Sequence, residues 1–305
     1  MTKNRRVGLG AFPKALWMAL QWRVMLIWIV LMALPTLIVA LPVGHALGAL
    51  LDHSLASTAL AQKFHGLQGG DALFLLMQHD GAAIGGATLA GLIVTLLLSP
   101  FLTGVVVTAV RGPRRSTLGE LMHGGLAQYW RMLRLMLWSL VPYIIALIIG
   151  SVAYSMAGAH AAQAILQSSA DRGYHAALIL LLVLLVLTNA IMEASRAQVA
   201  AEGSMHSATR AFGRGIAMLV RRPLATLGLY LGTSIIGFVL AGLVGMLRIH
   251  TNSAGAAGLI VAIVLTQLIV IILTWMRLAR IGALAMLARA TPFRGGSSVA
   301  ALAPA

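Results

Sequence analysis

Apolar residues gather in long runs that short polar stretches separate. Six of these runs reach the roughly 18–20 residues that a helix needs to cross a bilayer. They lie at about 15–43, 84–110, 135–157, 175–193, 224–247 and 256–279. No long segment alternates polar with apolar residues, as the strands of a membrane barrel do. Because the bilayer core offers no hydrogen bonds to the backbone, the runs predict an all-α, polytopic membrane protein with six transmembrane helices.

Two of the polar stretches predict amphipathic helices that lead into spans. Residues 116–134 begin with Thr117 and Glu120, which have the spacing of a capping box. Residues 204–221 place apolar side chains on one helical face, and Pro223 then opens the fifth run. We expect both helices to lie flat at the cytoplasmic membrane interface, as elbows before the third and fifth spans. The residues expected at this interface are Trp130, Arg131, Arg134, Arg210, Arg214, Arg221 and Arg222.

The starts of the first and third spans resemble each other. Gln21-Trp22-Arg23 resembles Gln128-Tyr129-Trp130-Arg131. A proline follows each segment further along the chain, Pro35 after the first and Pro142 after the second. These matches predict three degenerate repeats, each an elbow helix followed by a two-span hairpin. The alternative is that Trp and Arg occur at these positions because both favour interfacial depth in any membrane protein.

The loop of residues 44–83 is the only sizeable extracytoplasmic piece. We expect an amphipathic helix from Leu47 to Leu55, a break at Gly66 to Gly70, and a second short helix that Asp71 caps. Its four histidines match no established metal-ligand spacing, so we interpret them as solvated. They are His45, His53, His65 and His79. Residues 1–289 are expected to form one domain, and residues 290–305 a disordered tail.

The composition excludes a water-soluble fold. Of the 305 residues, 60% are hydrophobic and only 10% are charged, and the mean hydropathy is +0.93. Soluble domains carry about 25% charged and about 45–50% apolar residues. Cysteine is absent, so the prediction involves neither disulfides nor thiolate chemistry.

The formal net charge of +15 indicates membrane topology rather than nucleic acid binding. When six spans place alternate loops on opposite sides, nearly all of the 22 basic residues fall on the side of both termini. Only Lys63, Arg172 and Arg248 fall on the other side. The positive-inside rule then places both termini in the cytoplasm, and a bacterial inner membrane is the expected location. Anionic lipid headgroups are expected partners, each basic residue near the surface contributing about 1 kcal/mol.

Polar residues inside the spans are the first candidates for function, because each is costly in a membrane. Asn189, Glu193 and Arg196 recur at intervals of four and three residues, so they share one face of the fourth span. A carboxylate there has two interpretations: a proton or cation relay, or a structural ion pair with Arg196. We favour the ion pair because Glu193 lies close to the cytoplasmic edge. Gln267 in the sixth span is interpreted as a hydrogen bond between helices.

Small residues recur four positions apart on the second and fifth spans. The candidates for close helix packing on the fifth span are Gly228, Gly232, Ala241 and Gly245, and Gly81 with Gly85 is a second pair. Such spacing lets two helix backbones approach closely. The contact is expected either inside the six-helix bundle or against another membrane protein.

No catalytic motif accompanies these features. The sequence holds no phosphate-binding Gly-x-x-x-x-Gly-Lys loop, no nucleophile elbow and no His-Glu-x-x-His helix. We therefore predict that the protein is not an enzyme and uses neither a cofactor nor a metal ion.

The pattern resembles a group of bacterial membrane proteins. The resemblance is to two sets of such proteins and rests on three features. These are six spans with cytoplasmic ends, elbows before the third and fifth spans, and Glu193-Ala-Ser-Arg196 at the end of the fourth span. The two sets are the membrane domain of glycerophosphodiester phosphodiesterases and the uncharacterised YciC-like proteins. The resemblance covers most of residues 10–285. It implies a non-enzymatic integral protein, because catalysis in that group belongs to a soluble domain.

Two functions are consistent with these predictions. The first is a non-catalytic inner-membrane subunit that scaffolds or assists a larger assembly, such as a transport or export complex. The alternative is a permease subunit of an ATP-driven transporter, in which the helix of residues 116–134 docks the nucleotide-hydrolysing subunit. Both predict another membrane protein as a partner, and an ATP-driven transporter is one candidate for it.

Overall fold

The chain is helical throughout the part that the structure describes, which is residues 11–51, 66–112, 116–162, 167–203, 207–251 and 255–290. In the computed structural model the elements are α1 (Ala11–Met18), α2 (Trp22–Leu51), α4 (Gly66–Arg111), α5 (Leu118–Ala161), α6 (Gln167–Ala201), α7 (Ala208–Arg221), α8 (Pro223–His250) and α9 (Gly255–Ala290). Six of them, α2, α4, α5, α6, α8 and α9, are long and apolar enough to cross a membrane. The predicted all-α, multi-pass membrane fold with six spans is confirmed.

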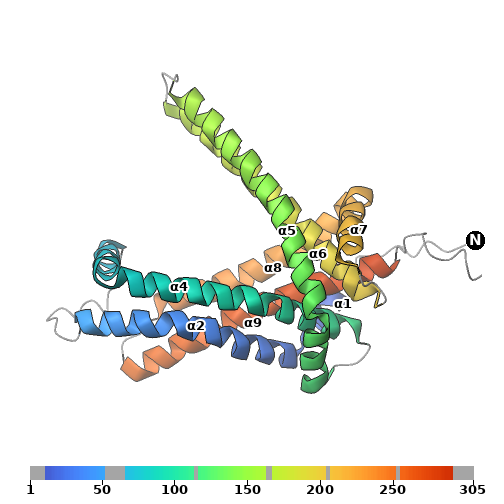
Figure 1. Ribbon diagram of the computed structural model, residues 1–305, viewed down its shortest axis with the longest axis horizontal. Helices are drawn as coiled ribbons and strands as arrows, with labels where there is room; N and C mark the ends of the chain where they lie inside the picture. The colour runs from blue at the N-terminus through green and yellow to red at the C-terminus, as the bar shows by residue number, and fades with distance from the viewer. Residues whose placement is uncertain are drawn as a thin grey trace, which may run out of the picture.

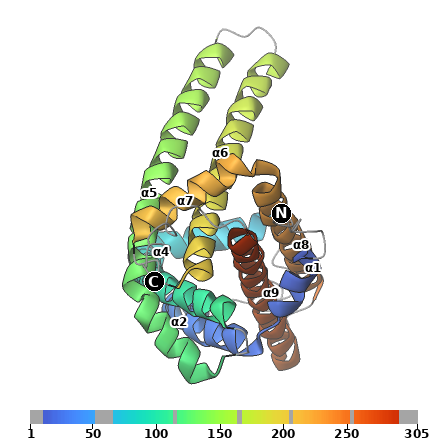
Figure 2. The same ribbon diagram turned by 90° about the vertical axis from the view of Figure 1, so that its right-hand side faces the viewer.

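The long helices pack in pairs that follow the chain: α2 with α4, α5 with α6, and α8 with α9. The first and last pairs form what we call the body, in which α9 contacts both α2 and α4. The α5–α6 hairpin joins the body at one end and then leaves it at a steep angle (Figure 1). We call its outer part, residues 140–161 and 167–189, the arm. Figure 2 shows the two helices of the arm side by side, with no other described helix along them beyond α7 at the base.

The buried core lies at the end where the three hairpins meet. Its largest fully buried side chains come from α2, α4, α5, α6 and α9 and include Leu102, Leu135, Met192 and Leu284. Away from this end, large apolar side chains are exposed on all three hairpins, for example Leu92, Ile148 and Ile263. The hairpins are therefore joined at one end, which we call the basic end because α4 and α9 finish there near Arg111 and Arg289.

Arginines from neighbouring helices satisfy the last carbonyls of α4 and α6 at the basic end. Arg111 donates from Nη2 and Nε to the carbonyl oxygen of Val199, at 2.6 and 3.2 Å. Arg289 donates to the carbonyl oxygens of Val110 and Ala200, at 3.4 and 3.2 Å. The last turn of a helix leaves such carbonyls without intrahelical partners, and its dipole favours a cation there. These two basic residues therefore tie helix ends together.

Local capping signals place the starts of three helices. Before α5, the Glu120 amide donates to Thr117 Oγ1 at 3.3 Å and the Thr117 amide donates to a Glu120 carboxylate oxygen at 2.9 Å. The predicted capping box is confirmed. Ser207 caps α7 in a similar way, with its hydroxyl accepting from the Arg210 amide. Pro223 is the first residue of α8, where the lack of an amide hydrogen costs nothing.

The stretch 116–134 is not a helix of its own. It is the first part of α5, which continues without a break through the third span. Leu121, Gly125, Gln128 and Met132 are buried on one side of this stretch, whereas Leu126 and Trp130 are exposed. No glycine or proline lies between residues 126 and 134 to end the helix, so helical hydrogen bonding passes directly into the span. By contrast, α7 is a separate helix, as expected for an elbow.

The predicted extracytoplasmic loop, residues 44–83, is shorter than expected, because parts of it belong to the long helices α2 and α4. The first span helix continues to Leu51, so Leu47 belongs to α2. The predicted break at Gly66 to Gly70 is wrong, because α4 already begins at Gly66 and Asp71 lies inside it. The break falls at Asp80, whose φ of −120° and ψ of 15° are not helical. Helix formers in residues 72–78 extend the helix backward through the glycines, because adding a turn costs less than nucleating one. Residues 52–65 lie outside the described residues.

The first span begins at Trp22 rather than near residue 15, because a turn separates α1 from α2. Trp275 of α9 donates from its indole nitrogen to the carbonyl oxygen of Leu16 at 3.0 Å, which fixes α1 against α9. At the other end of the chain, α9 runs well past the predicted end of the sixth span, to Ala290. The predicted disordered tail lies outside the described residues.

Candidate functional site

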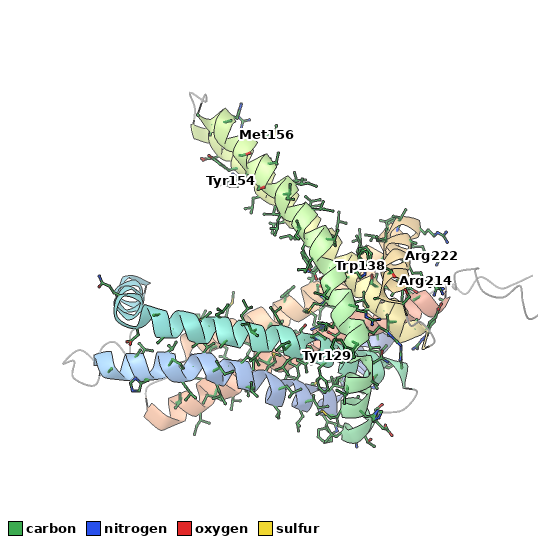
Figure 3. The ribbon with its side chains drawn as sticks, viewed as in Figure 1. Tyr129, Trp138, Tyr154, Met156, Arg214 and Arg222 are labelled. Atoms are coloured by element: carbon green, nitrogen blue, oxygen red, sulfur yellow. The ribbon has the colours of Figure 1, made fainter. Side chains whose placement is uncertain are left out.

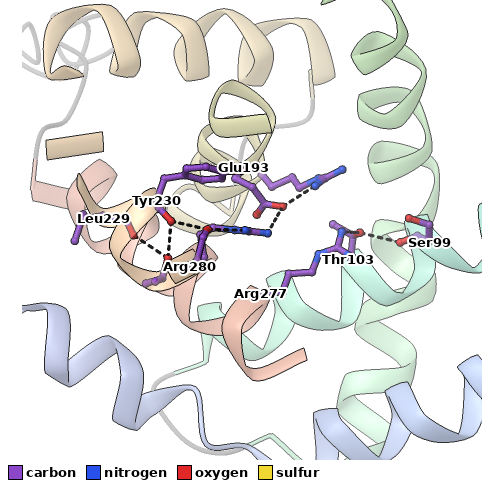
Figure 4. Close-up of polar contacts among 10 residues, drawn as sticks. Ser99, Thr103, Glu193, Leu229, Tyr230, Arg277 and Arg280 are labelled. Atoms are coloured by element: carbon purple, nitrogen blue, oxygen red, sulfur yellow. Dashed lines mark hydrogen bonds and ion pairs between the residues drawn. The ribbon is translucent and has the colours of Figure 1, made fainter. Parts of the chain in front are cut away.

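Four charged side chains meet where the arm joins the body (Figure 4). Glu193 and Arg196 come from α6, and Arg277 and Arg280 come from α9. We call these four residues the arginine cluster. Glu193 is only 2% exposed, and Arg280 is also buried. Charged groups at such depth are expensive unless they are paired, so the cluster is the strongest candidate for a functional site.

The carboxylate of Glu193 holds the arm to the body. Its Oε1 accepts from Arg196 Nη1 at 2.8 Å, within α6, and from Arg280 Nη2 of α9 at 3.3 Å. Arg196 is three residues after Glu193, so both side chains emerge on one helical face. The bond to Arg280 joins α6 to α9, and hence the base of the arm to the body.

Arg280 also connects α9 to α8. Its Nη1 donates to the hydroxyl of Ser234 at 3.1 Å, and its guanidinium lies over the ring of Tyr230 at 5.0 Å from the ring centroid. A cation over an aromatic face is attracted by the negative charge of that face. One arginine therefore fastens three helices to one another: α6, α8 and α9.

Arg277 makes the corresponding connections to α2 and α4. Its Nη2 donates to Thr103 Oγ1 at 2.8 Å, and Thr103 in turn donates to the carbonyl oxygen of Ser99. Its guanidinium lies 5.2 Å from the centroid of the Trp28 ring. With Arg280 it connects five of the six long helices through one buried polar network.

The charges in this network do not balance. Three guanidinium groups lie near one carboxylate, and Arg277 interacts electrostatically with both other arginines as well as with Glu193. Among the described residues, three buried atoms also have no hydrogen-bond partner: Glu193 Oε2, Arg277 Nε and Arg280 Nε. Buried polar atoms are nearly always paired in folded proteins, so these three are exceptions to that rule.

The structure brings together part of the predicted set. Glu193 and Arg196 are in contact, as their spacing predicts. Asn189 and Gln267 are half-buried, and neither is hydrogen-bonded to the arginine cluster in the described part of the chain. The predicted roles of these two residues stay predictions.

Sequence reasoning missed Arg277 and Arg280. The positive-inside rule counts basic residues near the end of the sixth apolar run as cytoplasmic charges, so neither arginine stands out as a site residue. The signal that could have found them is the sequence from Trp275 to Ala290, in which apolar residues and alanine keep a helical pattern around the arginines. Their three-residue spacing then places both on one face.

The predicted packing residues of the fifth span lie on different sides of α8. Ala241 is buried and Gly232 is half-buried, whereas Gly228 is exposed. A Cβ at Gly228 or Gly245 would meet no atom within 4 Å, and the same holds for Gly81 and Gly85. The glycine of α8 that does pack closely is Gly237, where an added Cβ would collide with Met276 of α9.

The predicted interface residues lie at the basic end. Trp130, Arg134, Arg210, Arg221 and Arg222 are exposed there, whereas Arg131 and Arg214 are half-buried. Arg214 forms an ion pair with Glu202, and Arg131 donates to the side chain of Gln128 at 3.2 Å. Figure 3 shows Arg214 and Arg222 close to α7 and the start of α8, far from the outer end of the arm.

Among the residues that the structure describes, no three His, Asp or Glu side chains lie close enough together to hold a metal ion. His53 and His65 lie outside those residues.

The chain matches no protein-family model, no curated protein and no solved structure. The resemblance to the phosphodiesterase membrane domain and the YciC-like proteins therefore stays a prediction, and function has to be argued from the geometry.

Proposed function

We propose that the protein is a non-enzymatic subunit that assists a larger membrane assembly, such as a transport or export complex, by offering its arm to another membrane protein. The observation that carries this proposal is the arm itself. It leaves the body at its base, where the arginine cluster connects α6 to α8 and α9. A hairpin fastened at its base and free along its length is suited to contact the helices of a partner.

The surface of the arm supports this role. Its two helices pack closely on each other, since a Cβ at Gly150 would lie 2.7 Å from a methyl group of Leu181. Outside this seam, Ile144, Ile145 and Ile148 are each more than half exposed. Tyr154 and Met156 lie near the outer end of the arm (Figure 3). Large apolar side chains on more than one side leave room for partner helices around the arm.

A face of α8 supports a second contact with the same partner. Gly228 and Gly242 are exposed and have no atom near an added Cβ, whereas Gly237 packs against α9. At 100° per residue, Gly228 and Gly242 lie on the side of α8 opposite to Gly237. Apolar side chains alone give helices in lipid no reason to associate, but open glycines permit close backbone contact.

The proposed location is the bacterial inner membrane, with the basic end and both termini in the cytoplasm. Exposed Arg134, Arg210 and Arg222 at that end support this orientation through the positive-inside rule. Trp130 is exposed at the same end, and tryptophan favours headgroup depth. Anionic lipids would contact these residues from the cytoplasmic leaflet.

A permease subunit of an ATP-driven transporter is the second candidate, favoured by one observation. The first turns of α5 expose Met122, Leu126 and Trp130 on the side away from the buried Leu121 and Met132. This apolar strip at the basic end is the part of the molecule that would dock a nucleotide-hydrolysing subunit. A crosslink from Leu126→Cys to a soluble ATP-hydrolysing protein would favour this candidate.

A cysteine scan of the arm tests the main proposal, because the chain contains no cysteine of its own. Single cysteines replace Ile144, Ile148 and Ile149 in turn, and membranes are treated with a short bifunctional thiol reagent. Residues 144 and 148 share a helical face, whereas residue 149 lies more than 90° away. We expect one adduct of constant mass from the first two positions, at least fivefold stronger than from the third.

The control is Leu41→Cys on α2, which is also apolar and exposed but lies on the body. Mass spectrometry of the adduct identifies the partner. Loss of the adduct in a Gly228→Leu variant would support the second contact on α8. Equal adducts from all four positions, or none from the arm, would contradict the proposal.

A further inference from the structure

We propose that an open pocket at the basic end binds the anionic headgroup of a membrane lipid from the leaflet at that end. Residues of α1, of the end of α4 and of the last turns of α9 line this pocket, whose volume is about 240 Å³. Figure 2 shows α1 beside α9 in this region, and the two helices are in contact. The chain has to lie in a membrane for such binding, but no partner of the arm is involved.

The walls of the pocket are partly apolar and partly polar, which suits an amphiphilic ligand. Met18, Leu278 and Met286 contribute apolar side chains, and Gln21 and Arg289 contribute polar ones. Met18 and Arg289 are exposed, so the pocket opens to the molecular surface. Sites that enclose whole small molecules have volumes of roughly 300–1,000 Å³. A pocket of about 240 Å³ is therefore suited to a headgroup, with the acyl chains left outside.

Arg289 and Gln21 supply the hydrogen bonds that a phosphate headgroup needs. Arg289 uses only Nη2 for its two bonds to helix-end carbonyls, and within the described part of the chain its Nη1 and Nε make none. The planar fork of arginine suits phosphate oxygens. Gln21 Nε2 donates to the carbonyl oxygens of Met18 and Ala109 at 3.3 and 3.5 Å. Its amide oxygen is then the atom that would accept from a headgroup hydroxyl.

The charges beside the pocket favour an anion. Arg111 interacts electrostatically with both Arg131 and Arg289, and none of the three takes part in an ion pair among the described residues. The ends of α4 and α6, which Arg111 and Arg289 contact, each act as about half a negative charge. Together they offset about one of the three positive charges. A lipid anion would reduce the remainder.

Exposed apolar side chains beside the pocket offer a place for the acyl chains. Trp17 lines the pocket and is 74% exposed. Trp22 and Leu26, one turn apart at the start of α2, are exposed as well. Tryptophan favours headgroup depth, so a lipid can reach the pocket sideways from the membrane. A free phosphate ion shares the chemistry of the headgroup but gains nothing from these side chains.

The test follows thermal unfolding of the full chain in detergent during titration with one ligand at a time. The ligands are phosphatidylglycerol, phosphatidylcholine with identical acyl chains, and inorganic phosphate. A ligand that binds only the folded state raises the unfolding temperature, and a tighter ligand does so at lower concentration. We expect phosphatidylglycerol to bind at least tenfold more tightly than phosphatidylcholine, because only the former carries a net negative charge.

A pocket-filling variant locates the effect. Gly282 lines the pocket, and a Cβ there would meet no atom within 4 Å. Gly282→Leu should therefore fold and yet weaken phosphatidylglycerol binding at least tenfold. Gly119→Leu is the matched control, because Gly119 also has open space around it but does not line the pocket.

A charge variant gives a second measurement. Arg289→Gln should weaken phosphatidylglycerol binding at least tenfold, whereas Arg210→Gln, which removes another exposed arginine, should leave binding unchanged. Because Arg289 also holds helix ends together, Gly282→Leu decides the matter where Arg289→Gln fails to fold.

Loss of phosphatidylglycerol binding in Gly282→Leu but not in Gly119→Leu would support a lipid in this pocket. Equal binding of the two lipids would overturn it, and so would unchanged binding in Gly282→Leu. Inorganic phosphate that stabilises the protein as much as phosphatidylglycerol at equal concentration would assign the pocket to a free ion and overturn the lipid.

Discussion

The Glu193→Gln variant should lose about 3–5 kcal/mol of unfolding free energy, the usual cost of removing one partner from a buried ion pair. Glu193 is 2% exposed and accepts from both Arg196 and Arg280. Without the carboxylate, three arginines remain close together with no opposing charge from the cluster. Denaturation in mixed micelles, followed by tryptophan fluorescence, measures the loss. Replacing both Glu193 and Arg280 by glutamine should cost less than replacing Glu193 alone, because one uncompensated charge is removed as well.

Glu202→Gln is the matched control for this prediction. Glu202 also pairs with an arginine, Arg214, but its side chain is 41% exposed. Exposed ion pairs contribute about 0–1 kcal/mol, so this variant should stay close to the unmodified protein. A Glu193→Gln variant as stable as Glu202→Gln would show that the cluster does not hold the fold together.

The second large effect is expected where α4 and α5 cross. A Cβ added at Gly125 would lie 2.8 Å from a methyl carbon of Val105 and 3.0 Å from the Phe101 ring. A Cβ at Gly104 would likewise lie 2.8 Å from the carbonyl oxygen of Gly125. The two backbones are therefore in direct contact. Gly125→Leu should cost about 3 kcal/mol or more, because overpacking a tight contact forces the helices apart.

Gly119→Leu supplies the comparison on the same helix. A Cβ at Gly119 meets no atom within 4 Å, and leucine is a better helix former than glycine. This variant should purify as a single folded species in size-exclusion chromatography, whereas Gly125→Leu should aggregate or unfold at a clearly lower temperature. Similar behaviour of the two variants would contradict the close crossing of α4 and α5.

Hydrophobic periodicity and local capping predict much of this fold. Runs of apolar residues identify all six spans, and Thr117 with Glu120 marks the start of α5 because a capping box depends only on residues within one turn. The departure of the arm from the body is not predictable in this way. It depends on long-range packing, such as the crossing at Gly104 and Gly125 and the pairing of Glu193 with Arg280, between residues that no periodicity relates to each other.

The same distinction explains the candidate site. Glu193 and Arg196 lie one helical turn apart, so their pairing is legible in the sequence. Arg280 approaches Glu193 from a helix 87 residues further along the chain, and only the packing of α6 against α9 brings the two together. An arginine near the end of an apolar run is also typical of a cytoplasmic charge, so topology alone does not reveal Arg277 and Arg280 as partners of Glu193.

The distance between two spin labels tests directly whether the arginine cluster holds the arm away from the body. Because the chain contains no cysteine, Ser155→Cys on the arm and Leu41→Cys on α2 can be labelled without further changes. Pulsed electron resonance in bilayer nanodiscs should give one narrow distance distribution that matches the separation of these residues in the structure. In the Glu193→Gln variant the distribution should become broad. A short distance expected for an arm packed along α2 and α4, or an identical distribution in the variant, would contradict this arrangement.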